Sequence, residues 1–355
     1  MAINLKTITP HKVSRDLSGY ITYVYGAEKS GKTTFAAAMP SPLILAFERG
    51  YNALPGVMAV DVTSWTDMKD CLRQLKDPEV KGTFKSIAVD TIDIAGSCCE
   101  KYVCAQNGVS ALNEIPYGQG WTKVKKEFED TFRAITQMGY AVVFISHAKD
   151  KTFKNKNGNE YSQIVPTCSN SYNDIAKNMA DIYAYADKYT ENGEAKVRLI
   201  LRSPDNSAET GCRFKYIDPV INFTYNDLVT ALNKAIDKEA ELNGGKLVTN
   251  EREVAAQAQE YDYDALRDEF EDLVGTLMNN NQEYFTPRIV QITEKYLGKG
   301  KKVSETTLDQ ANFIYLINTE IKEELITKIK YLTINPVPKR FGLIFFNFYD
   351  IIYVY

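Results

Sequence analysis

The chain has 355 residues, 44% hydrophobic and 25% charged, which is the balance of an ordinary globular protein long enough for two domains. Its net charge of −4 excludes the global basic field of a dedicated nucleic-acid coat protein. The charge is uneven, since residues 241–330 carry 17 acidic and 11 basic side chains while residues 1–240 are nearly balanced.

The first predicted element is a strand–turn–helix unit over residues 20–39, "YITYVYGAEKSGKTTFAAAM". The β-prone residues 21–25 predict a strand, and residues 34–39 predict a helix. The turn between them matches G-x-x-x-x-G-K-[ST], a loop whose backbone N–H groups cradle phosphate oxygens. Its lysine reaches the β- and γ-phosphates, and its threonine hydroxyl ligates Mg²⁺. We therefore predict a nucleoside triphosphate site, with a chance glycine-rich turn as the alternative. The predicted site is formed by Gly26, Ala27, Glu28, Lys29, Ser30, Gly31, Lys32, Thr33 and Thr34.

Strands and helices then alternate along the chain. Apolar segments predict strands at residues 43–48, 57–62, 86–90 and 140–146. Helical periodicity predicts helices that begin after Ser64, at residue 92 and at residue 121. Apolar strands separated by helices indicate a mainly parallel sheet covered on both faces.

Polar residues end three of these strands. Asp90 closes "SIAVD" and is the expected second carboxylate near Mg²⁺, with Asp93 as the alternative. Glu48 ends "LILAFE", where a carboxylate can orient the attacking water, although a solvent-exposed glutamate also fits. His147 follows "VVFIS", where it can contact the γ-phosphate or simply be a hydrogen-bonded histidine at a strand end.

Two hairpins are predicted after His147. The first turns at Asn157-Gly158, and the second turns within "TENGE" between residues 181–189 and 195–202. The first hairpin carries lysines and an aromatic residue, which suit phosphates and unpaired bases, although a solvated lysine-rich loop is the alternative. The candidate nucleic-acid residues are Lys149, Lys151, Phe153, Lys154 and Lys156.

A composition change near Asn243-Gly244-Gly245 separates the core from an acidic helical part. Beyond it, Thr286-Pro287 predicts one helix start, and a further helix is expected over residues 304–328. The aromatic tail is too short for a transmembrane helix, so no membrane contact is expected. The predicted domains are a lead at 1–17, an ATPase core at 18–240, a linker at 241–260, an acidic helical region at 261–330 and a tail at 331–355.

The six cysteines form no C-x-x-C pair, and the chain has only two histidines, so a zinc site is not expected. Residues 1–18 lack the apolar stretch of a signal peptide. These features predict reduced thiols in a cytoplasmic protein.

Four segments together resemble the RecA-like P-loop ATPases of bacteriophages, a group that includes single-strand annealing proteins. They are "YGAEKSGKTTFA", "LILAFERG", "SIAVDTID" and "VVFISHAKDK…NKNGNEYSQIVP", and the similarity covers about residues 18–240. The resemblance implies a RecA-type α/β core with an antiparallel hairpin extension and a C-terminal helical region. It also implies ATP, Mg²⁺, homo-oligomerisation, single-stranded DNA and a host-cell cytoplasmic location.

By the same resemblance, Glu48 matches the catalytic glutamate, and His147 stands where RecA proteins carry a sensing amide. RecA-like proteins often send basic residues to the γ-phosphate of a neighbouring subunit. Arg213 and Lys215 in "GCRFKYIDP" are the candidates for this role, because an extended segment would place both on one face, although a pair of solvated residues also fits.

The leading hypothesis is an ATPase that acts in DNA recombination, annealing or replication, with a single-stranded-DNA-binding protein as a further expected partner. A P-loop kinase or transferase acting on a small molecule is the second hypothesis. A non-catalytic interaction protein with ATP as a structural ligand is the third.

Overall fold

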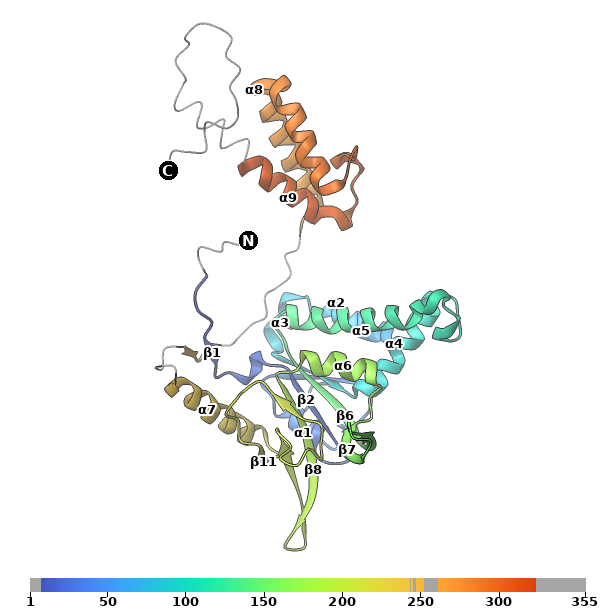
Figure 1. Ribbon diagram of the computed structural model, residues 1–355, viewed down its shortest axis with the longest axis vertical. Helices are drawn as coiled ribbons and strands as arrows, with labels where there is room; N and C mark the ends of the chain where they lie inside the picture. Colours follow the sequence, from blue (N-terminus) through green and yellow to red (C-terminus); the bar gives the residue numbers. More distant parts are fainter. Residues whose placement is uncertain (1–7, 243, 245–246, 252–260, 324–355) are drawn as a thin grey trace. The chain divides into compact units, whose positions relative to one another are not determined.

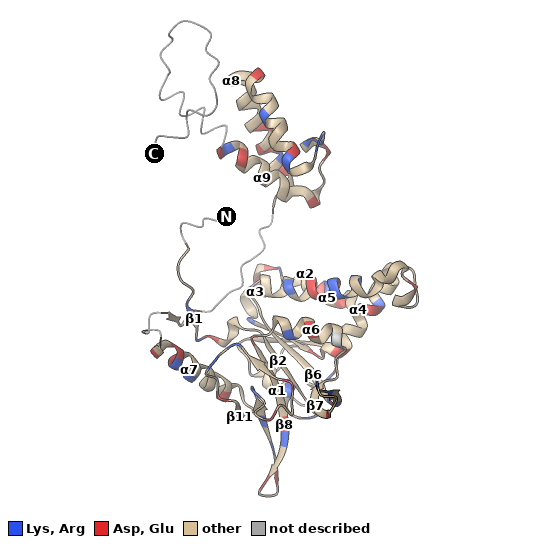
Figure 2. Ribbon diagram, viewed as in Figure 1, with Lys and Arg blue, Asp and Glu red and all other residues tan. Residues whose placement is uncertain are grey.

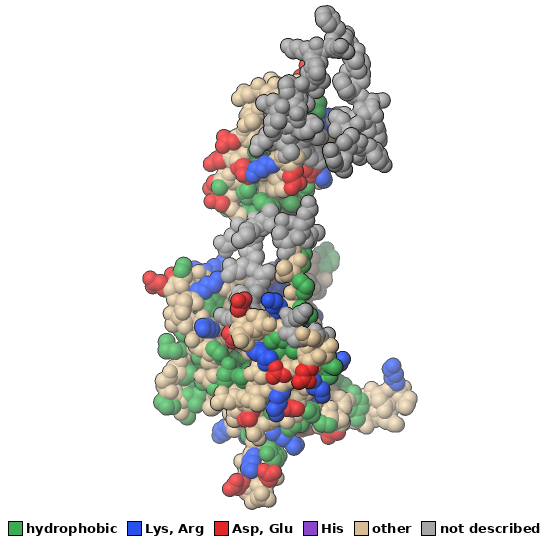
Figure 3. Space-filling view, turned by 90° about the vertical axis from the view of Figure 1, so that its left-hand side faces the viewer, with side chains coloured by type: hydrophobic (Ala, Val, Ile, Leu, Met, Phe, Trp, Pro, Cys, Tyr) green, Lys and Arg blue, Asp and Glu red, His purple; other side chains and the backbone are tan. Residues whose placement is uncertain are grey.

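The computed structural model describes residues 8–242, 244, 247–251 and 261–323 (Figure 1). The chain divides into two compact units, residues 1–258 and residues 259–355. On the face of the N-terminal unit seen in Figure 3, acidic and basic side chains are interspersed, as the small net charge leads one to expect.

The N-terminal unit is built on a ten-stranded sheet in the order β11-β9-β8-β2-β6-β5-β3-β4, with β7 beside β6 and β10 beside β8. The run from β8 to β4 is parallel, and the hairpins β6–β7 and β8–β9 are antiparallel. The main strands are β2 (Thr22–Gly26), β3 (Pro42–Ala46), β4 (Ala59–Asp61), β5 (Ser86–Asp90), β6 (Ala141–Lys154), β7 (Glu160–Pro166), β8 (Ile182–Glu191), β9 (Glu194–Ile200), β10 (Gly211–Cys212) and β11 (Val220–Asn222).

Helices cover both faces of this sheet because its central strands are apolar on both sides. Tyr23 and Tyr25 of β2 point into a core shared with α2, α4, α5 and α6, whereas Val24 points into a second core shared with α1 and α7. The helices are α1 (Lys32–Ala37), α2 (Trp65–Gln74), α3 (Pro78–Thr83), α4 (Ile92–Gln106), α5 (Gln119–Gln137), α6 (Asn170–Met179) and α7 (Tyr225–Leu242). The predicted class, a mainly parallel α/β core with antiparallel hairpins, is confirmed.

Several predicted elements are confirmed, and two strand ends are corrected. Ser64 caps α2 and forms a capping box with Asp67, and α4 begins at Ile92 as predicted. The strand predicted to reach Glu48 ends at Ala46, so Glu48 lies in the bend that follows. The strand predicted to end at Ser146 continues to Lys154, because the first arm of the hairpin is the same strand.

Both ends of the N-terminal unit contribute to a small separate sheet. Strand β1 (Val13–Ser14) pairs in parallel with β12 (Val248–Thr249), with Val13 opposite Val248. The Ser14 hydroxyl also donates a hydrogen bond to the Glu251 carbonyl oxygen at 2.6 Å. The expected lead and linker are therefore joined to each other by backbone pairing.

The C-terminal unit has an apolar core of its own between α8 (Tyr263–Leu297) and α9 (Ala311–Ile321). The predicted helix start at Thr286-Pro287 is wrong, since α8 breaks earlier, at Asn281, whose side chain accepts a hydrogen bond from the Tyr284 N–H. The helix expected from residue 304 begins at Ala311, after two short 3₁₀ turns.

The described residues include no helix that is both long and apolar enough to cross a membrane. The predicted aromatic tail at 331–355 lies outside the described residues, as does the expected end of the last helix beyond residue 323.

Candidate nucleotide-binding site

The phosphate loop runs from the end of β2 to the start of α1. Lys29 and Gly31 both have positive φ, 55° and 87°, so the loop turns through left-handed backbone. Gly26 is needed for another reason, because a Cβ there would lie 2.6 Å from the Ala186 carbonyl oxygen of β8. The sequence pattern thus reflects backbone shape at one glycine and strand packing at the other.

Lys32 lies buried at the first position of α1. Its Nζ donates hydrogen bonds to the Gly26 carbonyl oxygen at 2.9 Å and to the Ala27 carbonyl oxygen at 2.7 Å. Burial lowers the pKa of Lys32 to about 8, although the nearby carboxylates of Asp90 and Glu48 act in the opposite direction. Lys32 therefore begins to lose its positive charge as the pH rises toward 8.

Thr33 and Asp90 meet at the candidate metal site. The Thr33 hydroxyl donates to Asp90 Oδ2 at 2.6 Å, and Asp90 is buried at the end of β5. Burial raises the pKa of Asp90, and the hydrogen bond from Thr33 opposes this rise. Asp93, the alternative carboxylate, accepts a hydrogen bond from the Thr167 hydroxyl instead. The geometry therefore favours Asp90 as the partner of Thr33.

Gly50 closes over the Thr33–Asp90 pair, and the sequence reasoning missed it. A Cβ at Gly50 would lie 2.7 Å from Thr33 Oγ1 and 3.2 Å from Asp90 Oδ2. Only glycine therefore fits beside these two oxygen groups, which are the kind of ligand that Mg²⁺ prefers. Its position two residues after Glu48 in "FERG" was the available signal.

Glu48, in the bend after β3, faces His147 within β6. His147 Nε2 lies 3.1 Å from Glu48 Oε2, and the Glu48 N–H donates to the Asp90 carbonyl oxygen at 2.9 Å. His147 is also the register partner of Gly26 in the parallel pairing of β2 and β6. The structure thus brings the predicted catalytic residues together at the edge of the sheet that carries the phosphate loop.

The first hairpin separates the predicted nucleic-acid residues into two groups. Lys149, Lys151 and Phe153 alternate along one face of β6, and Phe153 stacks on the cross-strand Tyr161 with ring centroids 5.6 Å apart. Lys151 Nζ lies 5.0 Å from the centre of the Phe153 ring. Lys154 lies on the opposite face, where its Nζ is 3.4 Å from Glu160, and Lys156 lies in the connecting turn.

The segment that carries Arg213 and Lys215 is not extended, so the reason for placing both side chains on one face is wrong. Arg213 Nη1 lies 3.2 Å from Asp181 Oδ1, just before the start of β8, while the phosphate loop lies at the other end of that strand. Lys215 lies in a turn, with its Nζ 5.1 Å from the Tyr216 ring centre. Their role in a neighbouring subunit stays a prediction.

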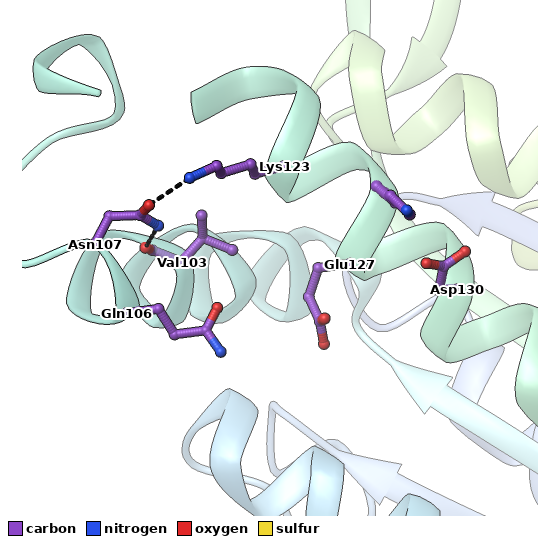
Figure 4. A pocket seen from close by; sticks show the side chains of 7 residues that line it. Val103, Gln106, Asn107, Lys123, Glu127 and Asp130 are labelled. Atoms are coloured by element: carbon purple, nitrogen blue, oxygen red, sulfur yellow. Dashed lines mark hydrogen bonds between the residues drawn. The ribbon is translucent and has the colours of Figure 1, made fainter. Parts of the chain in front are cut away.

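A separate pocket of about 530 Å³ lies between the end of α4 and α5 (Figure 4). Asn107 donates to the Val103 carbonyl oxygen and accepts from Lys123 Nζ, which fixes one wall. None of the predicted nucleotide residues lines this pocket.

Lys188 is a second residue that the sequence reasoning missed. Its Nζ donates a hydrogen bond to the carbonyl oxygen of Glu28, inside the phosphate loop. Figure 2 shows that the β8 strand carries basic residues, coloured blue. No local motif marks it, because β8 follows the loop by more than 140 residues and only the strand order brings the two together.

Three comparisons with known proteins describe what this chain is similar to. A family model described as an AAA domain matches residues 18–214. The SPbeta prophage-derived uncharacterized protein YorG of Bacillus subtilis (strain 168) is 31% identical over 336 residues, which cover 92% of this chain and 99% of that protein. A KaiC-like protein from Pyrococcus horikoshii OT3 has a crystal structure that covers 56% of this chain and 92% of its own, with 13% identity and a TM-score of 0.31.

The lowered pKa of Lys32 predicts pH-dependent ATP binding. Below pH 8 the lysine is charged before and after binding, so its protonation does not change the affinity. Above pH 8 binding must take up a proton, because the phosphates raise the pKa of Lys32, and we expect affinity to fall by up to about tenfold per pH unit. Calorimetry in buffers of different ionisation enthalpy measures this uptake. Lys32→Arg should abolish it, and the same uptake in that variant would contradict the assignment.

Gly50→Ala should impair metal-dependent turnover. The added Cβ would press on the Thr33 hydroxyl and on Asp90, so we expect a loss of about 10- to 100-fold in apparent Mg²⁺ affinity or activity. Gly82→Ala is the matched control, because a Cβ there meets nothing within 4 Å. Titrating Mg²⁺ in an ATP hydrolysis assay measures the effect, and an unchanged half-saturating Mg²⁺ concentration would disprove the role of Gly50.

Proposed function

This chain belongs to the AAA domain family of P-loop ATPases, and from that premise we propose that it hydrolyses Mg–ATP and couples hydrolysis to single-stranded DNA. The proposed setting is phage DNA recombination, annealing or replication in the cytoplasm of a bacterial host. A homo-oligomer and a single-stranded-DNA-binding protein are the proposed partners. The prophage origin of the 31% identical relative supports the setting.

The observation that carries the ATPase proposal is the convergence of five side chains at one end of the sheet. Lys32 lies in the loop, Thr33 and Asp90 share a hydrogen bond, and Glu48 lies against His147. When bound at Thr33 and Asp90, Mg²⁺ would neutralise phosphate charge. The carboxylate of Glu48 would orient and accept a proton from the attacking water, and His147 would hold Glu48 in place.

Continuity of β6 supports the DNA proposal. The strand that carries His147 beside the phosphate loop runs without interruption to Lys154 in the hairpin. Lys149, Lys151 and the stacked Phe153–Tyr161 pair lie on one face of this hairpin. Lysines bind the phosphate backbone as point charges, and aromatic faces stack on unpaired bases without sequence preference. The platform formed by Lys149, Lys151, Phe153 and Tyr161 is the proposed single-strand surface.

One assay separates this proposal from its alternatives. ATP hydrolysis is measured with and without single-stranded DNA, using Lys32→Ala as the inactive control. Stimulation by DNA supports the proposal. Transfer of phosphate to a small molecule, independent of DNA, would favour a kinase or transferase, and ATP binding without turnover would favour an interaction protein.

Glu48→Gln should keep ATP binding and lose hydrolysis by about 10²-fold or more, because the amide keeps the shape but cannot accept the proton. Binding is measured by calorimetry, and turnover by phosphate release. A wild-type rate in this variant would make Glu48 a surface residue, and Asp93 would become the next candidate.

Replacing Lys149 and Lys151 with alanine should weaken single-strand binding. If each lysine contacts one phosphate, the slope of log K against log salt should become less steep by about 1.4, from about 0.7 per phosphate. Lys154→Ala is the matched control, since Lys154 lies on the opposite face and pairs with Glu160. If the platform and control variants change single-strand binding equally, the hairpin is an ordinary charged surface.

A further inference from the structure

Strand β8 places a second lysine at the phosphate loop. In the parallel pairing of β2 and β8, Gly26 lies opposite Ala186, and a Cβ at Gly26 would approach the Ala186 carbonyl oxygen at 2.6 Å. This close approach holds β8 against the start of the loop. Lys188 follows two residues later, so its side chain leaves the strand on the same side as Ala186 and reaches the loop.

The two lysines bind three successive carbonyl groups of the loop. Lys32 Nζ donates to Gly26 at 2.9 Å and to Ala27 at 2.7 Å, and Lys188 Nζ donates to Glu28. Both ammonium groups therefore lie at the start of the same loop. An anion bound there would have two cations beside it, and a triphosphate supplies that negative charge.

Other charges on the β8–β9 hairpin are compensated by acids. Arg198 Nε lies 2.8 Å from Asp187 Oδ2, and Lys196 Nζ lies 2.7 Å from Glu191 Oε2. The hydrogen bond from Lys188 to a carbonyl group leaves its full positive charge in place. Lys188 therefore differs from Arg198 and Lys196, because its side chain binds a carbonyl group of the phosphate loop and theirs pair with carboxylates.

We propose that Lys188 contacts the γ-phosphate of ATP bound in its own subunit and stabilises the charge that develops during transfer. This inference rests on the proposed ATPase function. His147 of β6 and Lys188 of β8 lie on opposite sides of the first residues of the loop. Lys188 therefore supplies a positive charge to the loop of its own subunit. An arginine supplied in this way, in cis or from a partner, accelerates known P-loop enzymes strongly.

The test compares three substitutions of Lys188 with a control on the same hairpin. Lys188→Ala removes charge and donor, Lys188→Gln keeps an N–H donor for the Glu28 carbonyl, and Lys188→Arg keeps the charge. Lys196→Ala is the control, because it removes a lysine that pairs with Glu191 instead. Turnover and affinity for ATP and ADP are measured for each variant, together with thermal unfolding of the nucleotide-free protein.

We expect the alanine and glutamine variants to lose about 10²- to 10³-fold in kcat, as when one preorganised donor to developing charge is removed. Both should lose their preference for ATP over ADP. Their affinity for ADP should stay within twofold of the wild type, and their unfolding temperature should equal that of the wild type within experimental error. The arginine variant should keep most activity, and the Lys196 variant should match the wild type.

Three results would overturn the proposal. Equal losses of ATP and ADP affinity, or full activity of Lys188→Gln, would show that Lys188 only holds the loop in place. Recovery of turnover on mixing Lys188→Ala with Lys32→Ala subunits would show that Lys188 acts on a neighbour. Failure of the ATPase proposal looks different, because the wild type would then bind ATP without turnover, and the ATP-over-ADP preference would still test Lys188.

Discussion

The candidate site depends on β2 being held between β6 and β8 at Gly26. On one side the register partner is His147, and on the other it is Ala186, whose carbonyl oxygen leaves no room for a Cβ at Gly26. This double pairing fixes the direction in which the phosphate loop leaves the sheet. It also sets the positions of His147 and Lys188, because each lies on a strand whose register with β2 is fixed.

Buried tyrosines join the loop strand to the hairpin that follows the site. The Tyr25 hydroxyl donates to the Ile164 carbonyl oxygen of β7 at 3.0 Å and to the Glu209 carbonyl oxygen at 2.7 Å. Burial raises the pKa of Tyr25 far above its usual value, so the hydroxyl remains a neutral donor. Tyr25, immediately before Gly26, is therefore hydrogen-bonded to β7, the second strand of the hairpin that carries the proposed single-strand platform.

Local patterns in the sequence predicted those parts of the fold that depend on local physics. The phosphate loop, the Ser64 cap and α4 follow from glycine conformation, capping and helical periodicity within a few residues. Lys188 could not be found in this way, because only sheet order brings it to Glu28, and Gly50 offered no more than its place two residues after Glu48. The helix break at Asn281 was missed for a related reason, since Pro287 is the stronger local signal but α8 continues through it.

The position of charges bears on the proposed binding of ATP and DNA, because the chain as a whole has a net charge of −4. Excess acid is concentrated in residues 241–330, whereas Lys32 and Lys188 lie at the loop and Lys149 and Lys151 lie on the hairpin. Electrostatic attraction weakens strongly beyond about 10 Å at moderate salt, so the charges nearest a bound phosphate outweigh the net charge. Pairing sharpens this local effect, because the ion pair of Lys154 with Glu160 cancels one lysine on the face opposite the platform. The charge around the proposed sites therefore depends on which lysines the strand register brings there, together with the carboxylates of Asp90 and Glu48.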